Sequence, residues 1–204
     1  MLVQRRLGTR LAVSRDSGGD AGARGVSVFC IDPGGTTGWA WACLGYKELR
    51  SGGISGALSN ARRHSSGLLL GDHRFMVGQI QDRDEVTMTE MVWCMALTME
   101  AMGARTSAGA VEELTCVVLE DFILRERTSD RSLLSPVRLN AMLTQTITSE
   151  RPELSVVLQS PSDKSVIRDD QLKRWGLWSV GQQHARDATR HLVLWLRKNS
   201  SLWQ

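Results

Sequence analysis

Hydrophobic and polar residues follow two different periods along the chain, and the periods predict its secondary structure. Short apolar runs rich in β-branched residues and bounded by turn residues indicate strands, whereas apolar residues that recur every three or four positions indicate helices. Residues 57–84, rich in Gly, Ser, Arg, His and Asp, fit neither period. The predicted strands are 26–31, 36–44, 48–56, 115–119 and 154–158, and the predicted helices are 85–102, 135–149, 163–175 and 180–198.

The order of these elements predicts an α/β fold. Three strands separated by short turns indicate an antiparallel meander, and the later strands alternate with helices, which indicates parallel pairing. We therefore expect a mixed five-stranded sheet, three strands antiparallel and two parallel, with helices on both faces.

The length of 204 residues corresponds to one domain, which we place at 25–200. Residues 1–24 carry five arginines and two aspartates among Ser and Gly and have little apolar periodicity. They read as a flexible basic arm. Such an arm either contacts phosphates or lies upstream of the protein's true start.

Composition narrows the class of protein. The hydrophobic fraction of 42% and the charged fraction of 23% are those of a soluble globular protein, which we expect in the cytoplasm. No run approaches the ~18 apolar residues of a membrane span. Cys30, Cys43, Cys94 and Cys116 lack metal-binding spacing and are expected to be buried thiols. The net charge of +3 permits nucleic-acid binding without establishing it.

Two predicted strands end in a carboxylate. Asp32 follows the first apolar run and precedes a Pro-Gly-Gly turn, and Glu120 follows the apolar run 115–119. Asp32 alone fits a turn-forming role. A charge at the end of a second buried strand has no packing reason, and carboxyl ends of strands are the usual ligand position in α/β sheets. The pair therefore favours a functional site.

The last predicted helix supplies a third group. His184 and Asp187 are three residues apart and share a face, so His184 is a candidate metal ligand or proton relay. His191, one turn further on, is interpreted as an ordinary polar residue of the helix face. Three carboxylates in one crevice require compensation, which two Mg²⁺ ions, or Mn²⁺ in their place, would supply for phosphodiester hydrolysis.

Four segments in order resemble the RuvC-type Holliday-junction resolvases of phages, within the RNase H-like superfamily. The segments are IDPGGTTGWA at 31–40, VVLEDF at 117–122, QSPSDK at 159–164 and HARDATRH at 184–191. The resemblance implies a homodimeric, metal-dependent endodeoxyribonuclease that cleaves four-way junctions and other branched DNA. It also implies that Asp32, Glu120, His184 and Asp187 form the catalytic metal site, with Lys164 near the scissile phosphate. Some members have aspartate where this chain has His184.

Basic residues outside these motifs are candidates for DNA contacts, because phosphate contacts dominate such affinities. Arg62, Arg63 and His64 are further candidates, and the Met-rich helix 85–102 is a candidate dimer interface. Trp175 and Trp178 are interpreted as core or interface residues, because nothing in the sequence pairs them with a basic groove. The proposed DNA-binding residues are Arg125, Arg127, Arg131, Lys173 and Arg174.

Three other functions compete with junction resolution. The Asp-x-Gly-x-Thr pattern at 32–36 also resembles the phosphate loop of sugar-kinase-like and heat-shock-type ATP-binding domains, although those proteins are longer and carry a second loop. A module that binds branched DNA without cleaving it is a second alternative. The third is a nuclease that acts on forks or flaps.

Overall fold

The computed structural model describes residues 26–44, 62–64, 67–70, 73–82, 84–103, 113–122 and 131–199. Within them no helix is long and apolar enough to cross a membrane. The strands are β1 (Val26–Asp32), β2 (Thr36–Leu44), β3 (Arg62–His64), β4 (Gly67–Leu70), β5 (His73–Gln81), β6 (Leu114–Glu120) and β7 (Ser155–Gln159). The helices are α2 (Glu85–Gly103), α3 (Arg131–Glu150), the 3₁₀ helix η1 (Asp163–Val166), α4 (Asp169–Arg174) and α5 (Gln183–Lys198).

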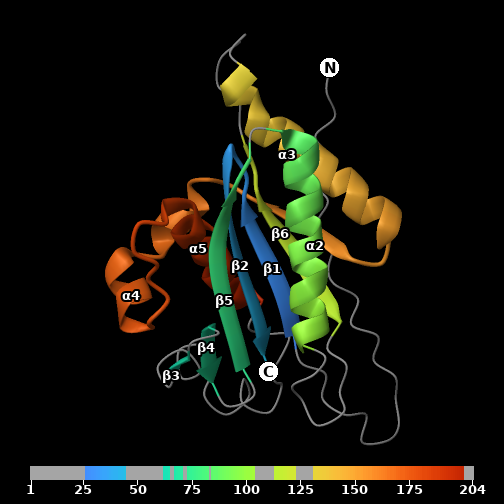
Figure 1. Cartoon of the computed structure of the whole chain (residues 1–204). Helices are drawn as coiled ribbons and strands as arrows, with labels where there is room; N and C mark the ends of the chain where they lie inside the picture. Colours follow the sequence, from blue (N-terminus) through green and yellow to red (C-terminus); the bar gives the residue numbers. More distant parts are fainter. Residues whose placement is uncertain are drawn as a thin grey trace, which may run out of the picture.

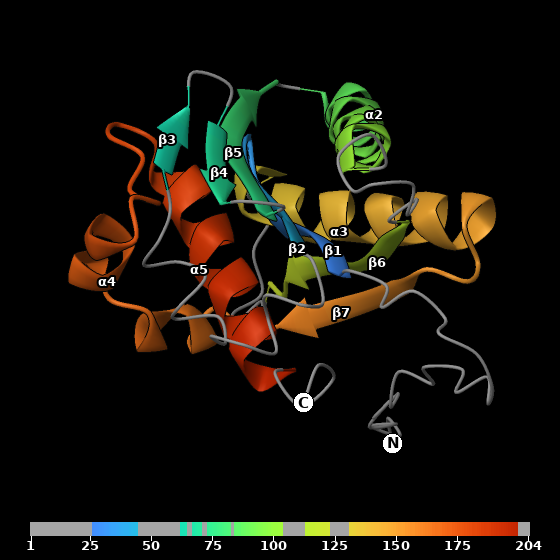
Figure 2. The same cartoon turned by 90° about the horizontal axis from the view of Figure 1, so that it is seen from below.

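The strands form one mixed sheet in the order β3-β4-β5-β2-β1-β6-β7. Strands β1 to β6 are labelled in Figure 1 and all seven in Figure 2. β5, β2 and β1 pair antiparallel, and β6 and β7 add to β1 in parallel. The predicted mixed sheet of three antiparallel and two parallel strands, flanked by helices, is therefore confirmed. The short strands β3 and β4 extend the sheet at its antiparallel edge.

Helices cover both faces of the sheet, and the pleat of the central strands divides the core between them. Viewed end-on, α4 and α5 lie on one side and α2 and α3 on the other (Figure 2). Successive residues of β1 point to opposite faces, so Val28 and Cys30 pack on the α5 side, whereas Phe29 and Ile31 pack on the α2–α3 side. Because both faces are buried, β1 is continuously apolar from Val28 to Ile31 rather than alternating.

The third strand of the meander is not where the pattern placed it. The predicted strand 48–56 lies outside the described residues, and the strand that pairs with β2 is β5. This strand belongs to the segment that had no assignable period. From Phe75 to Gln81 its side chains pass from buried through half-buried to exposed without regular alternation, so neither a clean strand pattern nor a continuous apolar run marks it.

Three helix boundaries differ from the prediction. The predicted helix 163–175 is broken into η1 and α4, because Ile167 and Arg168 are extended. The Gln171 side chain accepts a hydrogen bond from the Arg168 backbone N–H, which caps the start of α4. Helix α3 begins at Arg131, with Pro136 inside it, rather than at Ser135. Helix α5 begins at Gln183 rather than at Val180, because Gly181 has a positive φ of 74°, which a right-handed helix does not allow.

Cysteines follow the prediction with one exception. Cys30, Cys43 and Cys116 are buried thiols, but Cys94 is exposed. Cys94 lies next to the buried Trp93 on α2, and consecutive helical residues point in different directions. The apolar run around Cys94 therefore did not decide its burial.

Candidate functional site

Asp32 ends β1 at the edge of the sheet where α5 begins. It is 6% exposed and pairs with Gly38 in the register of β1 and β2. The helix start lies directly on that glycine, where a Cβ atom would fall 2.0 Å from the backbone of His184. This close approach brings Nδ1 of His184 to 2.8 Å from Oδ2 of Asp32. Two residues 152 positions apart are thus joined through a position that only glycine fits.

Glu120 lies beside Asp32 at the same edge. Ile31 and Leu119 pair in the parallel register of β1 and β6, so the two carboxylates follow at equivalent positions. Burial, together with the negative charge of Glu120, raises the pKa of Asp32 from its ordinary 3.8 to about 7, against the opposing effects of Lys164 and His184. The sheet therefore holds two carboxylates close enough to disfavour ionisation of one of them.

Lys164 joins Glu120 to Asp187. Its ammonium Nζ lies 2.9 Å from Oε2 of Glu120 and 3.0 Å from Oδ2 of Asp187. Burial lowers the pKa of Lys164, but the hydrogen bonds to both carboxylates outweigh this and raise it overall. The strand-to-helix corner therefore supplies a fixed positive charge between two acids that come from β6 and α5.

Asp187 has a second cationic partner. Nη1 of Arg190, one turn later on α5, donates to Oδ1 of Asp187, and Nε of Arg190 donates to the carbonyl of Ile167 at 3.1 Å. Both oxygens of Asp187, which is 8% exposed, therefore accept hydrogen bonds from cations.

His191 is part of the site, and its interpretation as an ordinary polar residue of the helix face was wrong. It is fully buried, with Nε2 at 2.8 Å from Oε2 of Glu120 and Nδ1 at 2.8 Å from Oε1 of Gln159. Gln159, at the end of β7, was likewise not identified as a site residue. The available signal was position: Gln159 ends a strand as Asp32 and Glu120 do, and His191 follows Asp187 by one helical turn.

The contacts of Glu120 shift its pKa in the opposite direction from that of Asp32. Burial raises the pKa of Glu120, but hydrogen bonds from His191 and Lys164 outweigh it and lower that pKa from 4.5 to about 2. Asn140 of α3 adds a hydrogen bond to the backbone carbonyl of Glu120 at 2.8 Å. Glu120 is thus held ionised, whereas the pKa of Asp32 lies close to neutral pH.

The described residues contain no group of three or more His, Cys, Asp and Glu side chains arranged to hold a metal ion. The contacts give the reason, because the ammonium of Lys164 lies between Glu120 and Asp187, where a cation would bridge them. The donor chemistry nevertheless fits Mg²⁺, which prefers carboxylate oxygens and retains several waters. The raised pKa of Asp32 is that of a buried carboxylate without sufficient positive charge nearby. The ligand set Asp32, Glu120, His184 and Asp187 stays a prediction.

The predicted DNA-contact residues divide between the described and the undescribed parts of the chain. Arg125, Arg127 and the side chain of Arg131 lie outside the described residues, as do the side chains of Arg62, Arg63 and His64. Lys173 and Arg174 are exposed on α4, and Arg174 lies 4.0 Å from Asp170.

Trp175 and Trp178 differ in their surroundings. Trp175 is buried in the core, as expected. Trp178 is only partly buried, and the cations of Lys173 and Arg186 lie 4.6 and 4.5 Å from its ring centroid. Its packing against the core agrees with the interpretation, and the two cations on its ring are a feature that the sequence did not indicate. Trp178 thus brings Lys173 of α4 and Arg186 of α5 onto one ring.

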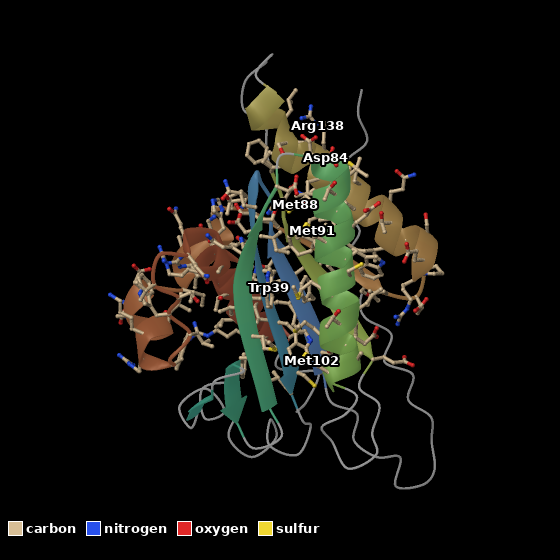
Figure 3. The ribbon with its side chains drawn as sticks, viewed as in Figure 1. Trp39, Asp84, Met88, Met91, Met102 and Arg138 are labelled. Atoms are coloured by element: carbon tan, nitrogen blue, oxygen red, sulfur yellow. The ribbon has the colours of Figure 1, made fainter. Side chains whose placement is uncertain are left out.

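The Met-rich helix α2 is mostly a core element. Met88 and Met99 are buried against the sheet, whereas Met91 is 42% exposed (Figure 3). Near Asp84 and Arg138, which are labelled there, a pocket of about 650 Å³ lies between the β1–β2 turn and the starts of α2 and α3. The predicted dimer interface on α2 stays a prediction.

Comparisons with known proteins find solved structures that resemble this chain but no protein related to it by sequence. No family model matches the chain, and no curated protein matches it. The solved structure of Thermus thermophilus RuvC in complex with Holliday junction substrate matches with a TM-score of 0.48 and 12% identity, over 86% of this chain and 97% of that one. A second Thermus thermophilus RuvC structure matches with a TM-score of 0.47 and 10% identity, over 86% of this chain and 98% of that one. At this level of similarity, the function has to be inferred from the side chains of this chain.

Proposed function

We propose that the protein is a divalent-metal-dependent endodeoxyribonuclease that hydrolyses phosphodiester bonds in branched DNA, with four-way junctions as the principal substrate. One observation carries the proposal. Asp32, Glu120 and Asp187 come from two neighbouring strand ends and the last helix; Lys164 forms ion pairs with Glu120 and Asp187, and Asp32 interacts electrostatically with both Glu120 and Lys164. The branched substrate and the homodimer follow from the motif resemblance, since two symmetric cuts suit a two-fold assembly.

Asp32, Glu120 and Asp187 are the residues that would hold Mg²⁺. When bound, the ions would supply charge neutralisation and an activated water for in-line displacement at phosphorus. Glu120 is already ionised because His191 and Lys164 hold it so. Lys164 is placed to move from the carboxylates to a phosphate oxygen, since a Lys side chain is a flexible point charge with three donors.

His184 is suited to proton transfer. Its side chain is 43% exposed, and its Nδ1 faces Oδ2 of Asp32. When Asp32 is ionised, the Nδ1–H tautomer donates to it, which leaves the Nε2 lone pair to accept a proton from water. Asp32 then orients the imidazole as well as binding the cation.

The ATP-binding alternative is disfavoured by the β1–β2 turn. The Thr37 side chain is buried, and its hydroxyl donates to the Gly34 carbonyl at 2.8 Å and accepts from the Gly34 N–H at 3.2 Å. The turn therefore uses internally both the Gly34 N–H, which belongs to the pattern at 32–36, and the Thr37 hydroxyl. A phosphate loop needs such donors to face the ligand.

The test is cleavage of labelled four-way, three-way and linear duplex DNA in Mg²⁺, Mn²⁺ or EDTA, by the wild type and Asp32→Asn. We expect the wild type to cut branched DNA only with a divalent ion, and Asp32→Asn to bind junctions without cutting. Binding without cleavage by the wild type would favour the DNA-binding module. Equal cutting of linear duplex would contradict the branched substrate, and wild-type cleavage by Asp32→Asn would contradict the metal site.

A further inference from the structure

Trp178, in the segment between α4 and α5, carries two cations on its ring. The Lys173 ammonium lies 4.6 Å and the Arg186 guanidinium 4.5 Å from the ring centroid. Nη1 of Arg186 also donates to the carbonyl of Ser179 at 2.7 Å. The ring itself is anchored, because Trp178 packs against the core under α5. The ring thus holds both cations, and the Ser179 carbonyl also holds Arg186.

The charges of Lys173 and Arg186 are not neutralised. Within the part of the chain that the structure describes, neither residue forms an ion pair with a carboxylate. A neutral ring orients a cation without cancelling its charge, so the pair attracts an external anion. Three other cations on this side are paired with carboxylates: Arg168 with Asp170, Arg190 with Asp187, and Lys198 with Asp163.

The cluster adjoins the candidate active site through α5. Arg186 directly precedes Asp187 and follows His184 by two residues, and consecutive Cα atoms are about 3.8 Å apart. Phosphates recur along a DNA strand at about 3.4 Å of helix axis. Arg186 therefore lies within one helical turn of His184 and Asp187, although its side chain leaves α5 in a different direction from theirs. A strand with its scissile phosphate at the candidate site has further phosphates within this span.

We propose that Lys173 and Arg186, held on Trp178, form a phosphate-binding subsite for the DNA strand that passes through the candidate active site. The inference rests on the proposed function and adds a strand-positioning element to it. Because the ring and the Ser179 carbonyl already fix the cations, binding costs less side-chain entropy than it would for free lysines and arginines. No existing ion pair has to break when a phosphate binds.

The salt dependence of DNA binding tests the subsite. Binding of a labelled four-way junction in EDTA is measured over a range of NaCl concentrations for wild type, Lys173→Gln, Arg186→Gln and the double variant. Loss of one phosphate contact makes the slope of log K against log salt shallower by about 0.9. We expect that change for each single variant and about twice that change for the double variant.

Arg197→Gln is the matched control. It makes the same change in net charge and also removes a guanidinium from a tryptophan ring, that of Trp175 at 5.1 Å. It lies 11 residues after Arg186 on α5, about 16 Å along the axis at 1.5 Å per residue. We expect it to keep the wild-type slope. Arg186→Lys retains the charge and is expected to keep the slope even if the loop packs less firmly.

Each outcome decides between the two proposals. If the wild type does not bind junctions, the proposed function fails, and the subsite fails with it. If the wild type binds and cleaves but Arg186→Gln has the same slope as Arg197→Gln, only the subsite is overturned. If Arg186→Lys loses slope as Arg186→Gln does, Arg186 acts through loop packing and the phosphate contact is overturned.

Discussion

Gly38 lies against the backbone of His184, where a Cβ atom would fall 2.0 Å from the carbonyl carbon and oxygen. The contact is between main chains of β2 and α5, so no change of rotamer relieves it. It sets the distance between the helix and Asp32, which is the register partner of Gly38. The packing of one strand therefore determines the geometry of the candidate site.

Gly38→Ala is expected to destabilise the fold by about 1–3 kcal/mol, the usual cost of overpacking, and to abolish the Asp32–His184 hydrogen bond. Urea denaturation measures the first effect and junction cleavage the second. Gly35→Ala is the control, because a Cβ there meets nothing within 4 Å. Equal stability of Gly38→Ala and wild type would contradict the close approach.

Replacement of Lys164 tests whether its ammonium stands where a metal would bind. In Lys164→Met, Glu120 and Asp187 lose their shared counter-charge, and we expect a loss of about 1.5–3 kcal/mol in EDTA, the range for hydrogen bonds to charged groups. Mg²⁺ would then replace that charge. Because a ligand stabilises the state that binds it, Mg²⁺ should raise the Tm of Lys164→Met more than that of wild type. An equal shift in both proteins would show that the ammonium and the ion do not share a position.

The two carboxylates at the sheet edge predict opposite pH effects on metal-free stability. The folded pKa of Asp32, about 7, lies above its ordinary 3.8, so its contribution is fully present below about 3.8 and is lost as pH rises through 7. The folded pKa of Glu120, about 2, lies below its ordinary 4.5, so its contribution is present above 4.5 and is lost as pH falls through 2.

Between pH 5 and pH 7.5 the Asp32 effect should dominate, and wild type in EDTA should be more stable at pH 5. Asp32→Asn lacks this titration, so its stability should change less across the same interval. Urea denaturation of both proteins at the two pH values gives the comparison. Parallel pH dependence in the two proteins would show that Asp32 titrates normally.

His191 and Gln159 should act as one unit on Glu120. His191→Phe removes one donor from Glu120, which keeps Lys164, and leaves Oε1 of Gln159 without its His191 partner, which costs about 1–3 kcal/mol for such a buried group. Gln159→Leu in the His191→Phe background removes that orphaned group, so the double variant should lose less than the sum of the single losses. A double-mutant cycle of unfolding free energies measures the coupling. Additive losses would mean that the 2.8 Å contact between His191 and Gln159 contributes nothing to stability.

The sequence by itself determined the central strands and the acidic ends of two of them. Buried strands such as β1 are continuous apolar runs, and a carboxylate that ends such a run stands out against it. The same local reasoning paired His184 with Asp187, because residues three apart share a helix face.

Only the tertiary structure decided the role of His191, the position of β5 and the pairing of Trp178 with Lys173 and Arg186. A histidine on a helix has the same local pattern whether it meets water or Glu120, since the partner lies 71 residues away. Strand β5 shows no clear period because its burial depends on which neighbours cover it. Long-range contacts set the role of His191 and the position of β5, whereas Trp178 meets Lys173 and Arg186 because the turn between α4 and α5 folds back on both helices.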